Sequence, residues 1–208
     1  MRRTALQERV TAPRTQTHRT PSPHRWKVRP LRWEDFHDVV RIYLELYDER
    51  KNGVPHGIPL RGTKPTLAEE VGWFADLYRK MLLGNALAIV AEKGGRVVGH
   101  CTVSRVGDSA AAENGHVGVL GILVDRRWRG KGVGRALMRE ALRRSRPLFD
   151  VVHLGVHSSN VGARRLYASL GFVPVGSIPR AVRRLGEVVD QDLMAIVFPP
   201  RTGRRANR

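Results

Sequence analysis

Short apolar runs with strand-like composition dominate the middle of this chain. The runs at 87–92, 97–106 and 116–124 are rich in Val, Ile and Leu and end in turn residues, which predicts three strands. The Gly94-Gly95 pair between the first two runs favours a tight hairpin. Similar runs towards the two ends predict four further strands, at 26–29, 152–156, 173–183 and 188–198.

Apolar residues at spacings of three and four predict four helices between these strands. The second helix opens at Thr66, because Thr66 and Glu69 have the spacing of a capping box, and it runs to Leu83. Two more helices are expected at 131–145 and 161–169. The first helix begins near Glu34 or Asp35 and has an apolar face of Val39, Val40, Tyr43, Leu44 and Leu46.

This order of elements predicts an α/β fold with a single mixed sheet flanked by helices. The opening strands should be antiparallel and the middle strands parallel. The segments 51–65, with its glycines and prolines, and 107–115 are expected to be loops. We expect one domain over 26–200, with a disordered basic tail at 1–25 and a second basic tail at 201–208.

The formal net charge of +18 is concentrated at the two ends of the chain. Residues 1–29 hold eight Lys or Arg and one Glu, and residues 201–208 hold four Arg. Such tails attract nucleic acid or another polyanion through electrostatics that do not depend on sequence. They are equally consistent with solvated segments that have no partner, and the sequence leaves both interpretations open.

The single cysteine, Cys101, excludes an intramolecular disulfide and fits a reducing cytosol. No apolar run reaches the ~18–20 residues that a membrane span needs. The N-terminus lacks the apolar core of a secretory signal. We therefore expect a cytoplasmic protein without a membrane span. No metal-ligand spacing joins Cys101 to His153 and His157, so we expect no metal site.

The most informative stretch is 123–137, where an apolar strand meets a basic, glycine-rich turn and then a helix. Glycine lets backbone N–H groups approach an anion closely, and the helix N-terminus points its free N–H groups and positive dipole end at the same place. Three cations add positive charge there, and the sequence predicts a phosphate or pyrophosphate pocket. The glycines are Gly130, Gly132 and Gly134, and the cations are Arg129, Lys131 and Arg135.

Two common phosphate motifs do not fit this turn. A Walker A loop requires Ser or Thr after its lysine, whereas Gly132 follows Lys131. The dinucleotide fingerprint starting at Gly130 would need glycine where Arg135 stands. The pattern R-G-x-G-x-G instead resembles the signature Q/R-x-x-G-x-G/A of the GNAT superfamily of acetyl-CoA-dependent N-acetyltransferases, matched by Arg129, Gly132 and Gly134.

A second motif strengthens this resemblance. Residues 152–172 contain N-x-x-A-x-x-L-Y-x-x-L-G-F, the pattern that the superfamily carries after its fifth strand. The resemblance covers 28–198 and implies a GNAT-type central mixed sheet with helices on both faces. It also implies acetyl transfer from acetyl-CoA to a primary amine, by direct attack through a tetrahedral intermediate.

The resemblance implies that acetyl-CoA is held at the strand end, the turn and the last helix. The pantetheine arm would pair with exposed backbone of the strand, which in the family is splayed from its neighbour at a bulge. Gly118 and Gly121 would make a bulge easy, or they simply weaken the strand. The expected contacts are Ile122, Leu123, Val124, Arg129, Gly130, Lys131, Gly132, Val133, Gly134, Arg135, Asn160 and Tyr167.

Tyr167 matches the family tyrosine that protonates the leaving thiolate, and its alternative role is core packing. The general base is harder to assign, because Gly118 stands where many members carry a glutamate. His116, on the same strand face, and Glu113, in the adjoining loop, are the candidates, and solvent is the third. Asp190 and Asp192 either hold a cationic acceptor or face solvent.

We therefore expect an N-acetyltransferase with acetyl-CoA as co-substrate and a small-molecule or protein amine as acceptor. The alternative is a nucleic-acid-associated binding protein on a GNAT scaffold, with weak or lost catalysis. Transfer of a different acyl group is a third option, since the turn recognises the CoA phosphates. Weak nucleic-acid contact through the tails is expected, and the oligomeric state stays open between monomer and homodimer.

Overall fold

The computed structural model describes residues 26–52, 60, 62–107, 109–184 and 186–200, so the expected tails and most of the predicted loop at 51–65 lie outside the described residues. Within these residues the strands and helices follow the order β1-α1-α2-β2-β3-β4-α3-β5-α4-β6-β7. The strands are β1 (Lys27–Pro30), β2 (Ala86–Lys93), β3 (Arg96–Arg105), β4 (Val117–Val124), β5 (Val151–His157), β6 (Val173–Arg184) and β7 (Glu187–Val197). The helices are α1 (Phe36–Lys51), α2 (Leu67–Leu82), α3 (Val133–Ser145) and α4 (Val161–Ala168).

All seven strands form one mixed sheet in the order β1-β2-β3-β4-β5-β7-β6. The β4–β5 pair is parallel, and every other neighbouring pair is antiparallel. The predicted α/β class with a single mixed sheet is therefore confirmed. The predicted elements also agree with the observed ones, apart from shifts of a few residues at their ends.

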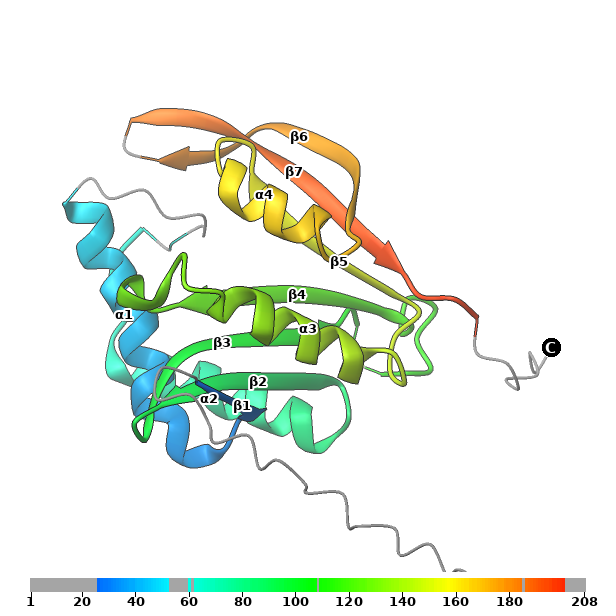
Figure 1. Ribbon diagram of the computed structural model, residues 1–208, viewed down its shortest axis with the longest axis horizontal. Coiled ribbons are helices and arrows are strands. Elements are labelled where there is room, and N and C mark those ends of the chain that lie inside the picture. The colour runs from blue at the N-terminus through cyan, green and yellow to red at the C-terminus, as the bar shows by residue number, and fades with distance from the viewer. Residues whose placement is uncertain (1–25, 53–59, 61, 108, 185, 201–208) are drawn as a thin grey trace, which may run out of the picture.

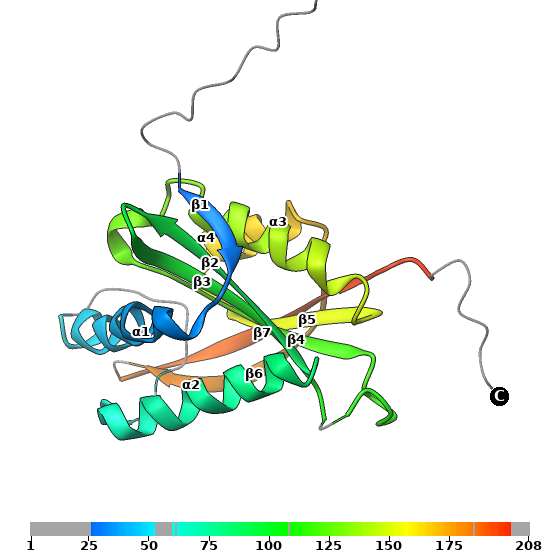
Figure 2. The same cartoon turned by 90° about the horizontal axis from the view of Figure 1, so that it is seen from below.

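Helices cover both faces of the sheet, as Figure 2 shows, with α3 and α4 on one side and α1 and α2 on the other. On the first side, Leu137 and Met138 of α3 are fully buried in a core shared with Leu154 and Val156 of β5. On the second side, α1 and α2 bury a smaller cluster that includes Phe74. The amphipathic faces predicted for the helices account for both layers.

The parallel pairing of β4 and β5 is short. It runs from Val117 opposite Val151 to Val119 opposite His153 and then stops. Beyond this point β4 stays paired with β3, while β5 stays paired with β7 as far as His157. Figure 1 shows the two strands diverging, which opens the sheet at its centre.

The splay arises without the expected bulge in β4. The register of β4 against β3 runs unshifted from Gly118 opposite Arg105 to Val124 opposite Gly99. Gly118 serves packing instead, because a Cβ there would lie 2.7 Å from Val103 Cγ1 and 3.2 Å from the ring of Phe149. A glutamate at position 118 would therefore displace core residues.

Candidate active site

The strand β4 ends in an acidic residue that organises the following turn. The carboxylate of Asp125 accepts hydrogen bonds from the backbone N–H of Arg127 at 3.0 Å, from the Arg127 guanidinium and from Arg41. Burial alone would raise the pKa of Asp125, but these hydrogen bonds outweigh it and lower the pKa to about 2. Asp125 is thus a buried anion that fixes the chain where it leaves the sheet.

The turn then delivers the chain to the N-terminus of α3. Gly132 is the N-cap residue with a φ of 85°, a left-handed conformation that glycine adopts without strain. No side chain caps this first turn within the described part of the chain, and the first N–H groups of a helix have no partner inside it. These N–H groups and the helix dipole make the predicted anion site.

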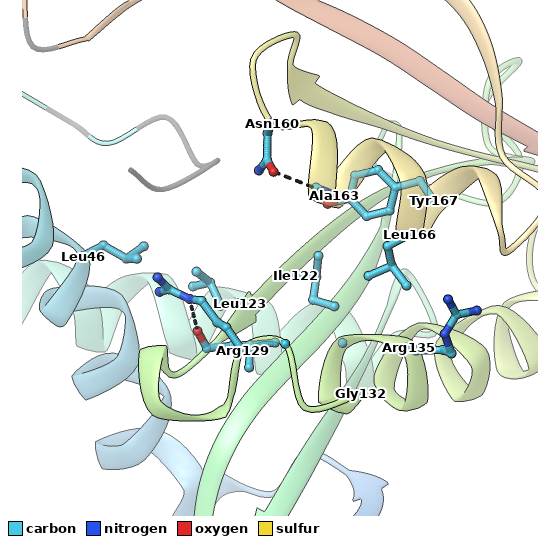
Figure 3. Close-up of a pocket in the computed structure, with 14 residues that line it drawn as sticks. Leu46, Ile122, Leu123, Arg129, Gly132, Arg135, Asn160, Ala163, Leu166 and Tyr167 are labelled. Atoms are coloured by element: carbon cyan, nitrogen blue, oxygen red, sulfur yellow. Dashed lines mark hydrogen bonds between the residues drawn. The ribbon is translucent and has the colours of Figure 1, made fainter. Parts of the chain in front are cut away.

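A cavity of about 560 Å³ lies at this turn, in the size range of ligand sites. Figure 3 shows it between β4, the start of α3, α4 and α1. A Cβ on Gly134 would come 3.4 Å from Leu166 Cδ2 and 3.7 Å from Ile122 Cδ1, so glycine keeps this part of the cavity open. The cavity, the glycines of the turn and the uncapped helix N-terminus suit the phosphates and the pantetheine arm of acetyl-CoA.

Ten of the twelve residues expected to contact the co-substrate line this cavity. They are Ile122, Leu123, Val124, Arg129, Gly130, Gly132, Gly134, Arg135, Asn160 and Tyr167. Two do not line it. The side chain of Val133 is buried in the core instead, and the Nζ of Lys131 lies 5.2 Å from the ring centroid of Trp128.

Four lining residues escaped the sequence interpretation: Leu46, Gly162, Ala163 and Leu166. Leu46 is on the apolar face predicted for α1, and the other three belong to the second motif. Leu46, Ala163 and Leu166 stand at apolar positions of helical spacing, whereas Gly162 is a variable position of the motif. Which apolar residue faces a cavity and which faces a neighbouring element depends on packing that periodicity does not describe.

The helix α4 places a tyrosine in the cavity wall. Its N-cap, Asn160, accepts a hydrogen bond from the backbone N–H of Ala163 at 3.1 Å, so its side chain caps the helix. Tyr167 is 9% exposed. Burial, and to a lesser degree Cys101, raise the pKa of Tyr167 to about 12. Its phenol therefore carries a proton at neutral pH.

The two base candidates lie elsewhere. His116 is exposed and immediately precedes β4, and six residues of strand, roughly 20 Å, separate it from Ile122 in the cavity wall. Glu113 is exposed in the preceding loop. Neither residue is among those that line the cavity. No described residue that lines the cavity is a histidine or a carboxylic acid.

Asp190 and Asp192 have partners within the protein. Asp192 accepts a hydrogen bond from Ser158 Oγ at 2.9 Å and pairs with Arg164 Nε of α4 at 3.0 Å. Asp190 accepts a hydrogen bond from the backbone N–H of Arg180 at 2.7 Å. Both carboxylates thus stabilise the β6–β7 region and α4. Across the described ranges, no cluster of histidine, cysteine and acidic residues has the arrangement of a metal site, and no helix could span a membrane.

Comparison with known proteins decides the family. The family model for the acetyltransferase (GNAT) family matches residues 36–172, which include the turn, the cavity and Tyr167. The chain belongs to the GNAT family. As a GNAT member it is an N-acetyltransferase with acetyl-CoA as its co-substrate, in agreement with the resemblance of both sequence motifs.

Two relatives and one solved structure illustrate this membership. The L-amino acid N-acetyltransferase AaaT of Escherichia coli is 36% identical over 52% of this chain and 67% of its own length. The N-alpha-acetyltransferase RimI of Mycobacterium tuberculosis is 40% identical over 46% of this chain and 58% of its own. A Salmonella typhimurium acetyltransferase structure with acetyl-CoA has a TM-score of 0.73 at 20% identity, covering 87% of this chain and 98% of that one. This last likeness concerns the GNAT fold alone.

Proposed function

We propose that this GNAT protein transfers an acetyl group from acetyl-CoA to a primary amine by direct attack, with Tyr167 as the general acid. The observation that carries the proposal is that the glycine-rich turn and the protonated phenol of Tyr167 line the same cavity. Acetyl-CoA supplies the acetyl group as a thioester. The turn from Gly130 to Gly134 holds the pyrophosphate through backbone N–H groups, and Arg135 adds a positive charge.

The splay in the sheet supports a role for β4 in holding the pantetheine arm. Beyond Val119 the edge of β4 that faces β5 makes no ladder with it, so the backbone groups of Ile122 and Val124 can pair with an amide-rich chain. This is the way in which an extended peptide adds to an open strand edge. The same backbone donors stabilise the oxyanion of the tetrahedral intermediate if they lie at the thioester.

Tyr167 protonates the leaving group in this proposal. As the C–S bond breaks, the phenol gives its proton to the CoA thiolate and regains one from the acetylated nitrogen, which carries a positive charge after the attack. This second transfer offsets the first, which is uphill because the phenol pKa of about 12 lies above a thiol pKa near 8.5. Because the described cavity wall offers no histidine or carboxylate, the amine loses its proton to water before it attacks. The amine then enters the cavity in its neutral form.

The names of two relatives support a primary amine as the acceptor. AaaT is named for L-amino acids and RimI for N-alpha-acetylation, and both kinds of acceptor present an α-amine. We extend only this shared feature to the present chain. A panel of amino acids and short peptides, with release of free CoA as the signal, is the corresponding screen.

The proposal is tested with Tyr167→Phe, which removes the proton donor and keeps the ring. We expect calorimetry to give an unchanged acetyl-CoA affinity, and we expect kcat to fall by about 10²-fold or more, the usual size of a general-acid contribution. Tyr78→Phe is the matched control, because Tyr78 lies on α2 away from the cavity. Unchanged turnover in Tyr167→Phe would contradict the acid assignment, and a wild type that does not bind acetyl-CoA would contradict the whole proposal.

A further inference from the structure

The signature arginine of the turn is engaged by a residue from a distant part of the chain. Glu49, in the last turn of α1, is 6% exposed. Its two carboxylate oxygens accept hydrogen bonds from the Nη1 and Nη2 atoms of Arg129, at 2.7 Å and 2.9 Å. This is the bidentate geometry that makes arginine–carboxylate pairs strong and directional.

The same guanidinium also binds the end of the strand. Arg129 Nε donates a hydrogen bond to the carbonyl oxygen of Val124 at 2.9 Å. The Arg129 side chain therefore links the turn to α1 and to the end of β4. The turn, the end of β4 and α1 all line the cavity, α1 through Leu46. In Figure 3 the Arg129 side chain points towards α1 and not towards α4.

This arrangement commits the charge of Arg129 to a protein carboxylate. A buried carboxylate that loses its partner is costly, so Glu49 strongly disfavours movement of Arg129 towards a ligand. The phosphates of the co-substrate must then be held by N–H groups whose directions depend on the turn. The directions of these N–H groups therefore depend on where Arg129 is anchored.

We infer that Glu49 is a positioning residue for the anion-binding turn, acting through Arg129. It fixes the turn so that the N–H groups from Gly130 to Gly134 converge in the cavity. The inference rests on the proposed acetyl-CoA site. In the opposite arrangement, Arg129 would leave Glu49 and bind a phosphate itself. A variant without the Glu49 carboxylate would then bind acetyl-CoA more tightly.

The experiment is a double-mutant cycle with the full chain, using Glu49→Gln, Arg129→Gln and the double variant. We expect each single variant to weaken acetyl-CoA binding in calorimetry by about tenfold, since small displacements of positioning groups have effects of this size or larger. The double variant should be no weaker than either single one, because the two residues act as one unit. The KM for acetyl-CoA should rise in parallel, with kcat little changed.

Asp48→Asn is the matched control. Asp48 neighbours Glu49 on α1 and is 63% exposed, so its loss changes the net charge equally without touching Arg129. We expect its affinity to equal that of the wild type. Tighter binding by Glu49→Gln, or additive effects in the cycle, would overturn the inference. Failure of the wild type to bind acetyl-CoA would instead overturn the proposed function.

A readout that does not depend on the ligand separates positioning from general stability. Hydrogen exchange of the backbone amides at 129–134 in the free protein should be faster in Glu49→Gln, whereas amides of the β2–β3 pair should be unchanged. Equal protection of the turn in variant and wild type would also overturn the inference. Uniformly faster exchange everywhere would do the same, because it would indicate a purely structural role.

Discussion

At the scale of single residues, the ionisation of Tyr167 sets a limit on the pH range of the reaction. A pKa raised to about 12 leaves the phenol protonated well above the ordinary range of tyrosine. We expect the rate to rise with pH as the acceptor amine deprotonates, with no descending limb from Tyr167 below about pH 10–11. A pH–rate profile with a stable amine substrate checks this. A tyrosine-dependent fall near pH 9 would contradict it, with Tyr167→Phe as the reference.

A second residue-scale prediction concerns His100 on β3. His100 is fully buried, it packs 6.4 Å from the Trp73 ring, and within the described chain neither ring nitrogen has a hydrogen-bond partner. Burial lowers the pKa of His100 to about 4. Because the folded pKa lies below the unfolded value, His100 opposes folding increasingly as the pH falls from about 6.5 towards 4.

Replacing His100 with leucine should remove this penalty. We expect His100→Leu to be at least as stable as the wild type at pH 7.5, since the leucine leaves no buried polar atom without a partner. Its advantage in unfolding free energy should grow by up to about 3 kcal/mol as the pH approaches 4. Urea unfolding at several pH values measures the difference. A difference that is constant with pH would show that His100 does not titrate as stated.

At the scale of elements, Asp125 holds the junction between β4 and the turn. Its pKa of about 2 lies below the value of an unfolded aspartate near 3.9, so it stabilises the fold above pH 4 and this contribution is lost as the pH falls towards 2. We expect Asp125→Asn to lower the unfolding free energy by about 2 kcal/mol at pH 7 and by progressively less below pH 4. Chemical denaturation at pH 7 and pH 3 tests this. Glu113→Gln, at an exposed carboxylate in the loop before β4, is the control for loss of a carboxylate.

The elements themselves were largely predictable from local sequence. The capping box of Thr66 and Glu69, for example, is formed as expected, with Thr66 N donating to Glu69 Oε2 at 2.7 Å and Glu69 N donating to Thr66 Oγ1 at 3.3 Å. Such signals involve neighbours in the chain. The bond between Glu49 and Arg129 joins residues 80 positions apart, and Glu49 is not among the residues singled out from the sequence. Long-range pairs of this kind are decided by packing.

The same distinction applies to the candidates for a base. Alternation along a strand places His116 and Ile122 on one face, because side chains repeat every second residue. It cannot say where along that face a ligand lies. The site is set by the point at which β4 and β5 separate, and that point depends on strand pairing between segments far apart in the sequence.

At the scale of the whole molecule, the excess positive charge and the cavity lie in different parts of the sequence. The net charge of +18 is concentrated at the chain ends, whereas the cavity is formed within 46–167. We expect removal of 1–25 and 201–208 to leave kcat/KM for a small amine unchanged within about twofold, since every residue that lines the cavity is retained. Any binding of DNA or RNA should weaken with salt and be lost on this removal. Lost turnover in the shortened chain would place the tails in the active site.

The order of strands in the sheet has a consequence for synthesis of the protein. β7 is the last strand to leave the ribosome, yet it lies between β5 and β6 and supplies the whole antiparallel partner of β5. Until residue 197 has emerged, β5 is paired only with β4, at three positions. The edge of β5 that later pairs with β7 is open. Open edges of this kind bind other strands. A chain interrupted by a premature stop before β7 would therefore present the open edge of β5 as a template for aggregation, even though every residue of the anion-binding turn had already been made.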